Sequence, residues 1–190
     1  MFNFGFLKKE IMEIGKTHKI IVLPAILLFF GLTSPMLAKF MNRILEPALK
    51  KEGIDPSAFL KEPALIDSYM QFFNNFVQIV LIAVVLVFMG AVVDEKVKGS
   101  VILVLTKSVS RSQFIVCKFL ASILLFTMAY SISVAAFSYY TYILFSTFLL
   151  PNTILSFILL WLLGVFIISV TIFASTLSRS EERRVGKECR

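Results

Sequence analysis

Residues 119–178 read FLASILLFTMAYSISVAAFSYYTYILFSTFLLPNTILSFILLWLLGVFIISVTIFASTLS, a run of 60 residues without one charged side chain. About 20 apolar residues in a helix suffice to cross about 30 Å of membrane hydrocarbon. A single helix of this length would extend about 90 Å, so the chain must fold back inside the run. The strongest turn signal in it is Pro151-Asn152. We therefore predict two membrane-spanning helices here, at about residues 119–148 and 153–177.

Two shorter stretches, residues 20–38 and 68–93, also lack charged side chains. Each has room for one span, which we place at about residues 20–39 and 69–93. The whole chain has 190 residues, of which 58% are hydrophobic and only 16% are charged. Soluble domains average about 25% charged residues, so a disordered chain and a disulfide scaffold are excluded, and the composition argues against a soluble enzyme. The fold class is an all-α integral membrane protein with four transmembrane helices, and a water-soluble four-helix bundle is the alternative.

The last twelve residues, RSEERRVGKECR at 179–190, change the composition abruptly. This string resembles the translation of a short-read sequencing adapter, and the other interpretation is a basic cytoplasmic tail. If it is an adapter artefact, the native net charge is +5 instead of +7, and Cys117 is the only native cysteine. The chain would then be an amino-terminal fragment that ends near Ser178.

Lysine and arginine residues are distributed unevenly among the segments that join these spans. Five lie between the second and third spans and four before the first, whereas the long segment 40–67 has four, which its acidic residues balance. Short connections rich in Lys and Arg remain on the cytoplasmic side. The distribution places the amino terminus and residues 94–118 in the cytoplasm. The net charge therefore follows membrane topology and does not indicate a nucleic-acid partner.

Residues 1–19 lead into the first span and combine apolar and charged positions. Phe4, Leu7, Ile11 and Ile14 follow helical spacing, with lysines and glutamates elsewhere. This pattern predicts an amphipathic helix in the cytoplasmic membrane interface. A polar leader without a fixed structure and a cleaved signal peptide are the alternative interpretations.

The first span and the segment after it contain several helix-breaking residues. Pro24, Gly31 and Pro35 predict a kink near the outer end of the span. Residues 40–67, with four further prolines and glycines and mixed charge, read as an external loop with short helices, for example around residues 44–51.

The second span begins with a stripe of amide side chains. Gln71, Asn74, Asn75 and Gln78 recur at intervals of three and four residues, which places them along one side of a helix. Polar side chains in membrane helices normally face neighbouring helices or a cavity. The stripe is therefore a helix-packing surface or a translocation surface, and the sequence leaves both open.

Residues 94–111 read DEKVKGSVILVLTKSVSR. Burying the four charges of residues 94–98 at the bilayer centre would cost on the order of 10 kcal/mol, at about 2.5–3.5 kcal/mol each. They must therefore lie outside the hydrocarbon. Val101–Leu105 is apolar but too short to span the membrane. A short apolar helix of this kind binds either the lipid interface or a groove on a protein partner.

The pattern E-x-x-x-G-S at residues 95–100, the short apolar helix, S-V-S-R at 108–111 and Lys118 resemble the first cytoplasmic loop of type 2 ABC exporter permeases. In that family the loop typically reads E-x-x-x-G-T, then L-L-[ST]-x-P-[VI]-S-R and K. Ser100 therefore replaces a threonine and Ser108 a proline. FLKKEIMEI, TSPMLAKF and YMQFFNNFVQI are also similar to the interfacial helix and the first two spans of these permeases. The resemblance covers about residues 6–178.

The resemblance implies a permease subunit with about six membrane helices, of which four are present. It implies that the cytoplasmic loop contains a coupling helix that docks on a dimer of a separate ABC ATPase subunit, which binds ATP and magnesium. The coupling residues carried over are Glu95, Gly99, Ser100, Ser110 and Arg111. The other expected partners are a second permease copy or homologue and membrane lipids. The expected location is the plasma membrane of a prokaryote.

No catalytic group is expected in this chain. The native part has no phosphate-binding loop of the Walker type, its single histidine cannot build a metal site, and the spans lack the ionisable residues of ion-coupled transporters. We expect no bound cofactor and no metal site. The alternative function is a membrane scaffold or sensor whose residues 94–111 bind lipid. The transported substrate stays open, with lipids, peptides, small drugs and ions among the candidates.

Overall fold

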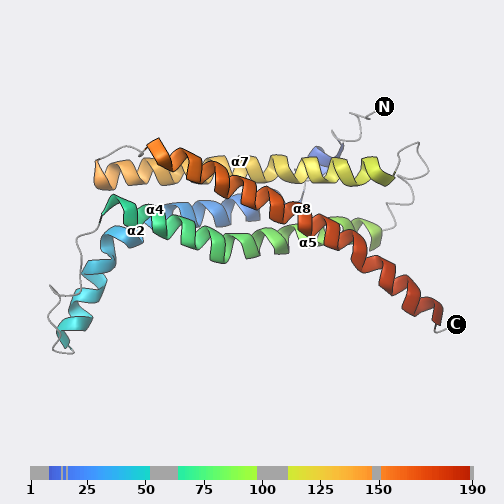
Figure 1. The fold of residues 1–190 in the computed structure, drawn as a ribbon, viewed down its shortest axis with the longest axis horizontal. Coiled ribbons are helices and arrows are strands. Elements are labelled where there is room, and N and C mark those ends of the chain that lie inside the picture. The colour runs from blue at the N-terminus through green and yellow to red at the C-terminus, as the bar shows by residue number, and fades with distance from the viewer. Residues whose placement is uncertain are drawn as a thin grey trace.

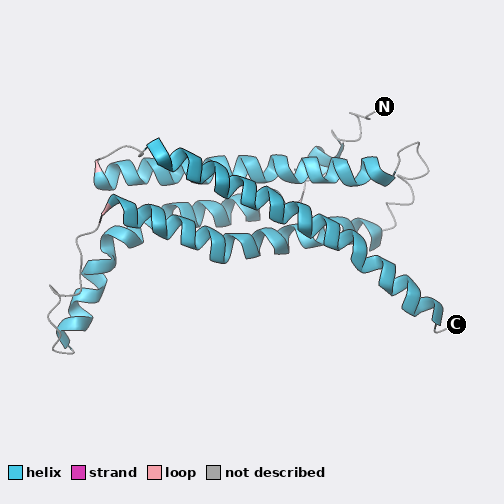
Figure 2. Ribbon diagram, in the orientation of Figure 1, coloured by secondary structure: helices cyan, strands magenta, loops and turns pink. Residues whose placement is uncertain are grey.

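The computed structural model describes residues 9–13, 15, 17–51, 64–97, 111–146 and 151–188. It describes the backbone alone for 42–45, 48–51, 90–97, 111, 151–152 and 177–188. All regular secondary structure in these ranges is helical (Figure 2). The elements are α2 (Lys19–Lys51), α4 (Leu65–Asn75), the π-helical segment η1 (Phe76–Val80), α5 (Leu81–Val97), α7 (Arg111–Phe145) and α8 (Pro151–Glu188).

Four helical stretches in the described residues are long and apolar enough to cross a membrane. They are Lys19–Met41, Leu65–Met89, Ser112–Phe145 and Thr153–Thr176. The second stretch is built from α4, η1 and α5 in succession. The prediction of an all-α integral membrane protein with four spans in this chain is confirmed.

The four spans form a bundle in which direction alternates along the chain (Figure 1). The first and third spans, α2 and α7, run in the same direction and make the most extensive contact in the bundle. The second and fourth spans run the opposite way, and α5 packs on α8. We call the end at which α5 ends and α7 begins the α5–α7 end, and the opposite end the α7–α8 end.

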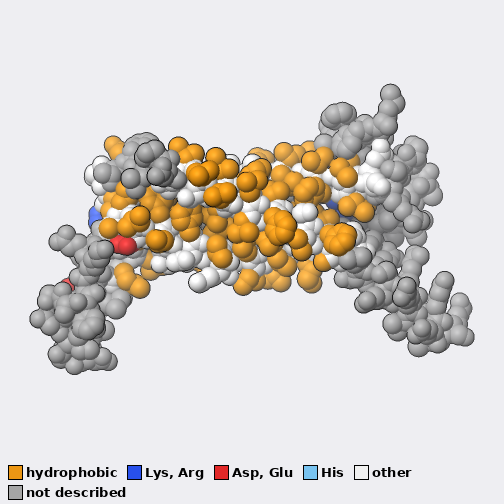
Figure 3. All heavy atoms as spheres, in the orientation of Figure 1, with side chains coloured by type: hydrophobic (Ala, Val, Ile, Leu, Met, Phe, Trp, Pro, Cys, Tyr) orange, Lys and Arg blue, Asp and Glu red, His pale blue; other side chains and the backbone are white. Residues whose placement is uncertain are grey.

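The outer surface of the bundle is apolar along its length. Figure 3 shows hydrophobic side chains over the whole visible face, with the few charged atoms toward its ends. Large side chains such as Met128, Leu86 and Phe166 are 67%, 66% and 63% exposed. A water-soluble bundle would turn polar side chains outward instead. The apolar exterior is that of a bundle surrounded by lipid.

The core is built largely from aromatic rings contributed by three spans. Phe72 of α4, Phe137 of α7 and Phe157 of α8 meet with ring centroids 4.6–6.0 Å apart. Phe76 continues this cluster along the bundle, with its ring 5.6 Å from that of Tyr130. Such pairs are worth about 0.5–1.5 kcal/mol each beyond the area they bury. The phenylalanine-rich composition therefore serves internal packing as well as contact with lipid.

Two glycines allow helices of this bundle to approach closely. A Cβ at Gly31 of α2 would lie 2.7 Å from Oγ and 2.9 Å from the backbone oxygen of Ser133 on α7. A Cβ at Gly164 of α8 would collide with the ring of Phe126 on α7. Small residues at such crossings are a common way to pack membrane helices. Gly31 is thus a packing residue, and α2 stays helical through it.

Hydroxyl side chains inside the spans bond mainly to the helix that carries them. Several donate to the carbonyl four residues earlier, which satisfies them without a partner helix or water. These are Thr33, Ser34, Ser122, Ser131 and Thr171.

Helix ends differ from the limits that hydropathy suggested. α7 begins at Arg111 instead of residue 119. Residues 111–118, which we expected to be the last part of the 94–118 loop, are therefore helical. α2 continues without interruption through residues 40–51, where a loop with a separate short helix around 44–51 was expected, and it contains Pro24, Pro35 and Pro47. Figure 1 shows its last part turning away from the bundle, and prolines inside a helix are a common cause of such a bend. α8 runs on to Glu188, so residues 179–188 are helical. Whether they are native stays a prediction.

Candidate functional site

The two described ends of the segment that the sequence singled out for coupling lie at the α5–α7 end of the bundle. α5 ends at Val97 and α7 begins at Arg111, and both helix ends lie at this end of the bundle (Figure 1). Glu95 is in the last turn of α5 and Arg111 opens α7, in both cases with the backbone alone described. The remaining expected coupling residues, Gly99, Ser100 and Ser110, lie outside the described residues, and so does the predicted short helix at 101–105.

A buried ion pair lies at the same end. The Nζ atom of Lys118 on α7 donates to Oε2 of Glu10 at 3.2 Å. Glu10 belongs to the helical stretch Lys9–Glu13, which we call the interfacial segment. Its side chain is only 2% exposed and that of Lys118 9%. The pair joins the amino-terminal segment directly to the helix that follows the coupling segment.

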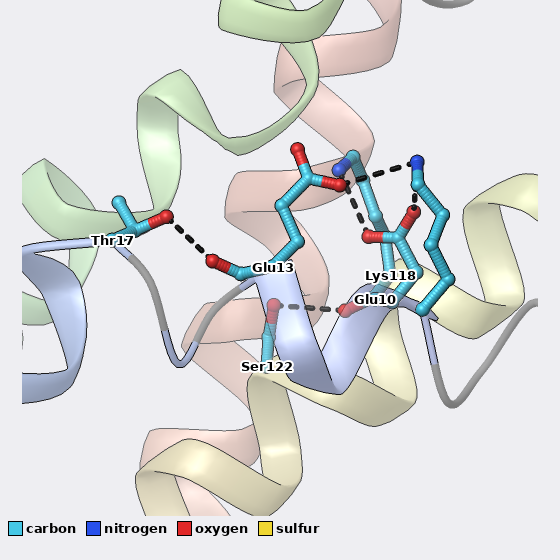
Figure 4. A network of polar contacts seen from close by, with 6 residues as sticks. Glu10, Glu13, Thr17, Lys118 and Ser122 are labelled. Carbon is cyan, nitrogen blue, oxygen red and sulfur yellow. Dashed lines mark hydrogen bonds and ion pairs between the residues drawn. The ribbon is translucent and has the colours of Figure 1, made fainter.

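Neighbouring charges extend this pair into a small network (Figure 4). Lys9 Nζ lies 3.2 Å from Oε2 of Glu13 and 3.9 Å from Oε1 of Glu10. Oε1 of Glu10 is buried and accepts no hydrogen bond from the described residues. The carboxylate of Glu10 therefore lies between two ammonium groups, one from its own segment and one from α7.

The surroundings of Lys118 hold its backbone and side chain in place. Ser122 Oγ donates to the carbonyl oxygen of Lys118 at 2.9 Å, one turn along α7. The ammonium group lies 5.4 Å from the centre of the Phe114 ring, one turn before it. Breaking a buried ion pair by removing one partner typically costs about 3–5 kcal/mol. Replacing either Glu10 or Lys118 alone would therefore destabilise the folded protein.

The sequence predicted only part of this junction. Lys118 belongs to the family-like pattern, but Glu10 was one of several charges in the leader. The expected apolar face of the leader included Ile11, which is 45% exposed, while Glu10 faces the bundle. Phe4, Leu7 and Ile14 lie outside the described residues. A glutamate among the charges of a leader carries no signal of burial, because its partner is 108 residues away in the sequence.

The amide stripe of the second span divides into two parts. Gln71 and Asn75 are half-buried, and Gln71 Nε2 donates to Asn75 Oδ1 at 3.2 Å. Asn75 Nδ2 donates in turn to Oγ of Ser34 on α2 at 3.1 Å. Asn74 and Gln78 are exposed on the surface of the bundle. One half of the stripe thus packs between helices, and the other half points away from this four-helix bundle.

The stripe coincides with an irregular turn that the sequence did not reveal. Directly after Asn75 the helix widens into η1, and the N–H of Leu81 bonds to the carbonyl of Phe76 five residues earlier. π-helical turns inside α-helices occur frequently at functional sites. Gln78 lies within this turn and is exposed. No proline or glycine lies in η1, so the usual signals of an irregular helix are absent.

A shallow groove of about 400 Å³ lies between α7 and α8. Its polar atoms bond within its own walls. Tyr130 donates from its hydroxyl to the carbonyl of Phe157 at 2.8 Å, and Trp161 Nε1 donates to Thr127 Oγ1 at 3.1 Å. The groove is therefore predominantly a product of helix packing.

At the α7–α8 end a second lysine joins two helices. Lys39 Nζ of α2 bonds to the carbonyl oxygen of Leu144 in the last turn of α7. A cation near a helix C-terminus is favoured by the helix dipole. In the described part of the chain, no three His, Cys, Asp or Glu side chains are grouped as a metal site would require.

Comparison with known proteins gives a family match over nearly the whole chain. The profile of the family described as "ABC-2 family transporter protein" matches residues 6–186. The chain is 27% identical over 182 residues to the "Uncharacterized transmembrane protein YxlG" of Bacillus subtilis strain 168, which covers 93% of this chain and 68% of that protein. No solved structure matches.

Proposed function

Because the chain belongs to the ABC-2 family of transporter proteins, we propose that it is the membrane-spanning permease subunit of an ATP-driven exporter. The observation that carries this proposal is the family match over residues 6–186, on a chain with four membrane-spanning helices. The chain itself acts as the non-catalytic membrane subunit. A separate ATPase dimer binds ATP and magnesium and supplies the chemical step.

The ATPase docks on residues 94–111. Two observations support this location: the charges at 94–98 cannot enter hydrocarbon, and α5 and α7 end and begin at the same end of the bundle. Glu95, Gly99, Ser100, Ser110 and Arg111 are the coupling residues. Glycine gives the backbone freedom for a sharp turn, and arginine offers a rigid set of donors for bidentate contacts.

The protein lies in the plasma membrane of a prokaryote, with its amino terminus and residues 94–118 in the cytoplasm. The uneven distribution of Lys and Arg supports this orientation. The relative from Bacillus subtilis is described as a transmembrane protein of a bacterium.

A second permease copy or homologue completes the transport unit, and the exposed amides take part in the pathway between them. Asn74 and Gln78 are exposed on the second span, beside a π-helical turn. An amide that faces lipid alone is unfavourable, because its hydrogen bonds stay unmade. These two side chains therefore face either a further membrane helix, such as one of the second copy, or a hydrated translocation path, whereas Gln71 and Asn75 serve helix packing.

Co-purification with any ABC ATPase encoded by a gene adjacent to that of this protein tests the proposal. The tagged permease should retain that ATPase in detergent or nanodiscs, and ATPase activity should rise in its presence. Glu95→Ala and Arg111→Ala should reduce both binding and stimulation. Lys61→Ala, in the segment proposed to lie outside the cell, is the matched control and should change neither.

The scaffold or sensor alternative makes the opposite prediction. In that case residues 94–111 bind lipid, no ATPase is retained, and Glu95→Ala leaves any ATPase activity unchanged. Binding of the purified chain to liposomes would not separate the two functions, because every integral membrane protein inserts into lipid. Retention of the ATPase separates them.

A further inference from the structure

The interfacial segment Lys9–Glu13 is attached to the bundle in two different ways. Toward α7 it is held by the buried Glu10–Lys118 ion pair. Toward α2 it is joined through Thr17 and His18, which are not helical. The regular helix resumes only at Lys19. A non-helical break therefore separates the segment from α2, which follows it directly in the sequence. The segment is bonded instead to α7, which is distant in the sequence.

The break between the segment and α2 is locally stabilised. Thr17 Oγ1 donates to the carbonyl of Glu13 at 2.8 Å (Figure 4), and the N–H of Ile21 bonds to the carbonyl of His18 at 3.1 Å. These bonds satisfy backbone groups at the end of one helical stretch and at the start of the next. The non-helical link can change its backbone angles without breaking a long helix, as hinge positions do.

Lys118 is also close to the coupling segment along α7. It lies two turns after Arg111, about 10 Å at 1.5 Å per residue. The intervening stretch is continuous α-helix. A displacement of the first turn of α7 therefore moves Lys118 with it.

Burial makes this ion pair a firm attachment. A lysine near a helix end can extend its side chain to water along the apolar surface. Lys118 does not, since its side chain is only 9% exposed and its ammonium group bonds to a carboxylate that is 2% exposed. Separating the two groups would break the hydrogen bond between two buried charges and leave Glu10 with the more distant Lys9, at 3.9 Å.

We propose that Glu10 and Lys118 are positioning residues that fasten the interfacial segment to α7, so that the segment moves with the ATPase-docking end of α7 and not with α2. The identity of the driving partner rests on the proposed function. The fastening itself rests only on the ion pair and the break at Thr17–His18.

Distances between spin labels on the full chain in nanodiscs test the fastening without any ATPase. Labels are attached at Met12→Cys and Met128→Cys, which replace side chains that are 56% and 67% exposed, after replacement of the native cysteines by alanine. The parent should give one narrow distance distribution. Glu10→Gln and Lys118→Met should each broaden it. Lys118→Arg, and the reversed pair Glu10→Lys with Lys118→Glu, should restore the narrow distribution.

Lys39→Met is the matched control, because it removes one lysine that bonds α2 to α7 at the opposite end. It should leave the Met12–Met128 distribution narrow. Loss of the narrow distribution in Lys39→Met as well as Lys118→Met would indicate general loosening and overturn the proposal. An unchanged distribution in both Glu10→Gln and Lys118→Met would also overturn it.

A second pair of labels tests the direction of coupling in the complex with the ATPase. Met12→Cys is combined with Phe29→Cys on α2, a position 60% exposed, and spectra are compared without nucleotide and with ATP and vanadate. The Met12–Phe29 distance should change and the Met12–Met128 distance should stay constant. The reverse result, or no change in either distance, would overturn the proposal. Failure of the parent to retain any ATPase would instead contradict the proposed function, and the labels without ATPase would still decide the fastening.

Discussion

The side-chain amide of Asn75 on α4 donates to the hydroxyl oxygen of Ser34 on α2 at 3.1 Å, between the first two spans of the bundle. Ser34 Oγ also donates to the carbonyl of Phe30 at 2.6 Å, and Asn75 Oδ1 accepts from Gln71. A chain of hydrogen bonds thus runs from the second span to the backbone of the first. Ser34 is fully buried, so nothing but protein can satisfy it.

Replacing either partner of this bond should weaken the contact between the first two spans. Hydrogen bonds between membrane helices are worth about 0.6 kcal/mol on average and up to about 1.7 kcal/mol. We expect Asn75→Leu and Ser34→Ala each to lower the free energy of unfolding within that range. The double variant should lose less than the sum, because the two changes remove one shared interaction. Steric trapping in bicelles measures these free energies.

Asn74→Leu is the matched control for this prediction, because Asn74 is the neighbouring amide but is exposed. It should leave the unfolding free energy of the single chain unchanged. Strict additivity of Asn75→Leu and Ser34→Ala would contradict the coupling between them.

Gly31 offers a sharper test of the contact between α2 and α7. In Gly31→Ala the new Cβ would meet both Oγ and the backbone oxygen of Ser133 at under 3.0 Å. A side chain can rotate away, but the backbone oxygen can move only if the helices separate. We expect a loss of about 1–3 kcal/mol, typical of overpacking, and lower thermal stability in detergent.

The control is Gly15→Ala, where a Cβ would meet nothing within 4 Å. Alanine is favoured over glycine in helices by roughly 0.5–1 kcal/mol, so this variant should be neutral or more stable. Equal destabilisation by both substitutions would show that close approach at Gly31 is not the cause.

Hydropathy predicted the spans well and the helix ends poorly, for one physical reason. Charge-free runs mark where hydrocarbon begins, which is why the run at 20–38 and the predicted span at 153–177 coincide closely with helical stretches that are long and apolar enough to cross a membrane. A helix need not stop there. α7 extends beyond its charge-free part to Arg111, and Lys118, within this extension, finds a carboxylate partner in the protein. An averaged hydropathy does not reveal that a charged side chain is buried against a partner elsewhere in the chain.

The irregular features of the candidate site lay beyond sequence-based prediction for a different reason. The stripe from Gln71 to Gln78 assumes regular helical spacing, which predicts one common face. The π-helical turn at η1 interrupts that spacing. It contains no proline or glycine, the residues that usually indicate an irregular helix. The burial of Glu10 depends on contacts made far along the chain. Both features follow from tertiary packing rather than local pattern.

The hydroxyl of Tyr130 joins α7 to α8 by donating to the carbonyl of Phe157 at 2.8 Å. Tyr130→Phe keeps the ring that packs against Phe76 and Phe126 and removes only this bond. We expect a loss of about 0.5–1.5 kcal/mol, measured as a lower unfolding free energy in bicelles. Tyr139→Phe, at a position 63% exposed, should have no effect. A loss in Tyr139→Phe as large as in Tyr130→Phe would mean that the buried hydrogen bond is not responsible.

Trp161 is the single tryptophan of the sequence, so its fluorescence reports directly on the contact between α7 and α8. Its Nε1 donates to Oγ1 of Thr127 at 3.1 Å. Thr127→Val nearly preserves the shape of the side chain but removes the acceptor, so the indole N–H loses its polar partner in the groove. Because polar partners stabilise the excited indole, we expect the emission maximum to shift to shorter wavelength. Ser131→Ala is the control, since this hydroxyl lines the same groove but bonds to its own helix. A spectrum of Thr127→Val that superimposes on that of the parent protein would contradict the hydrogen bond.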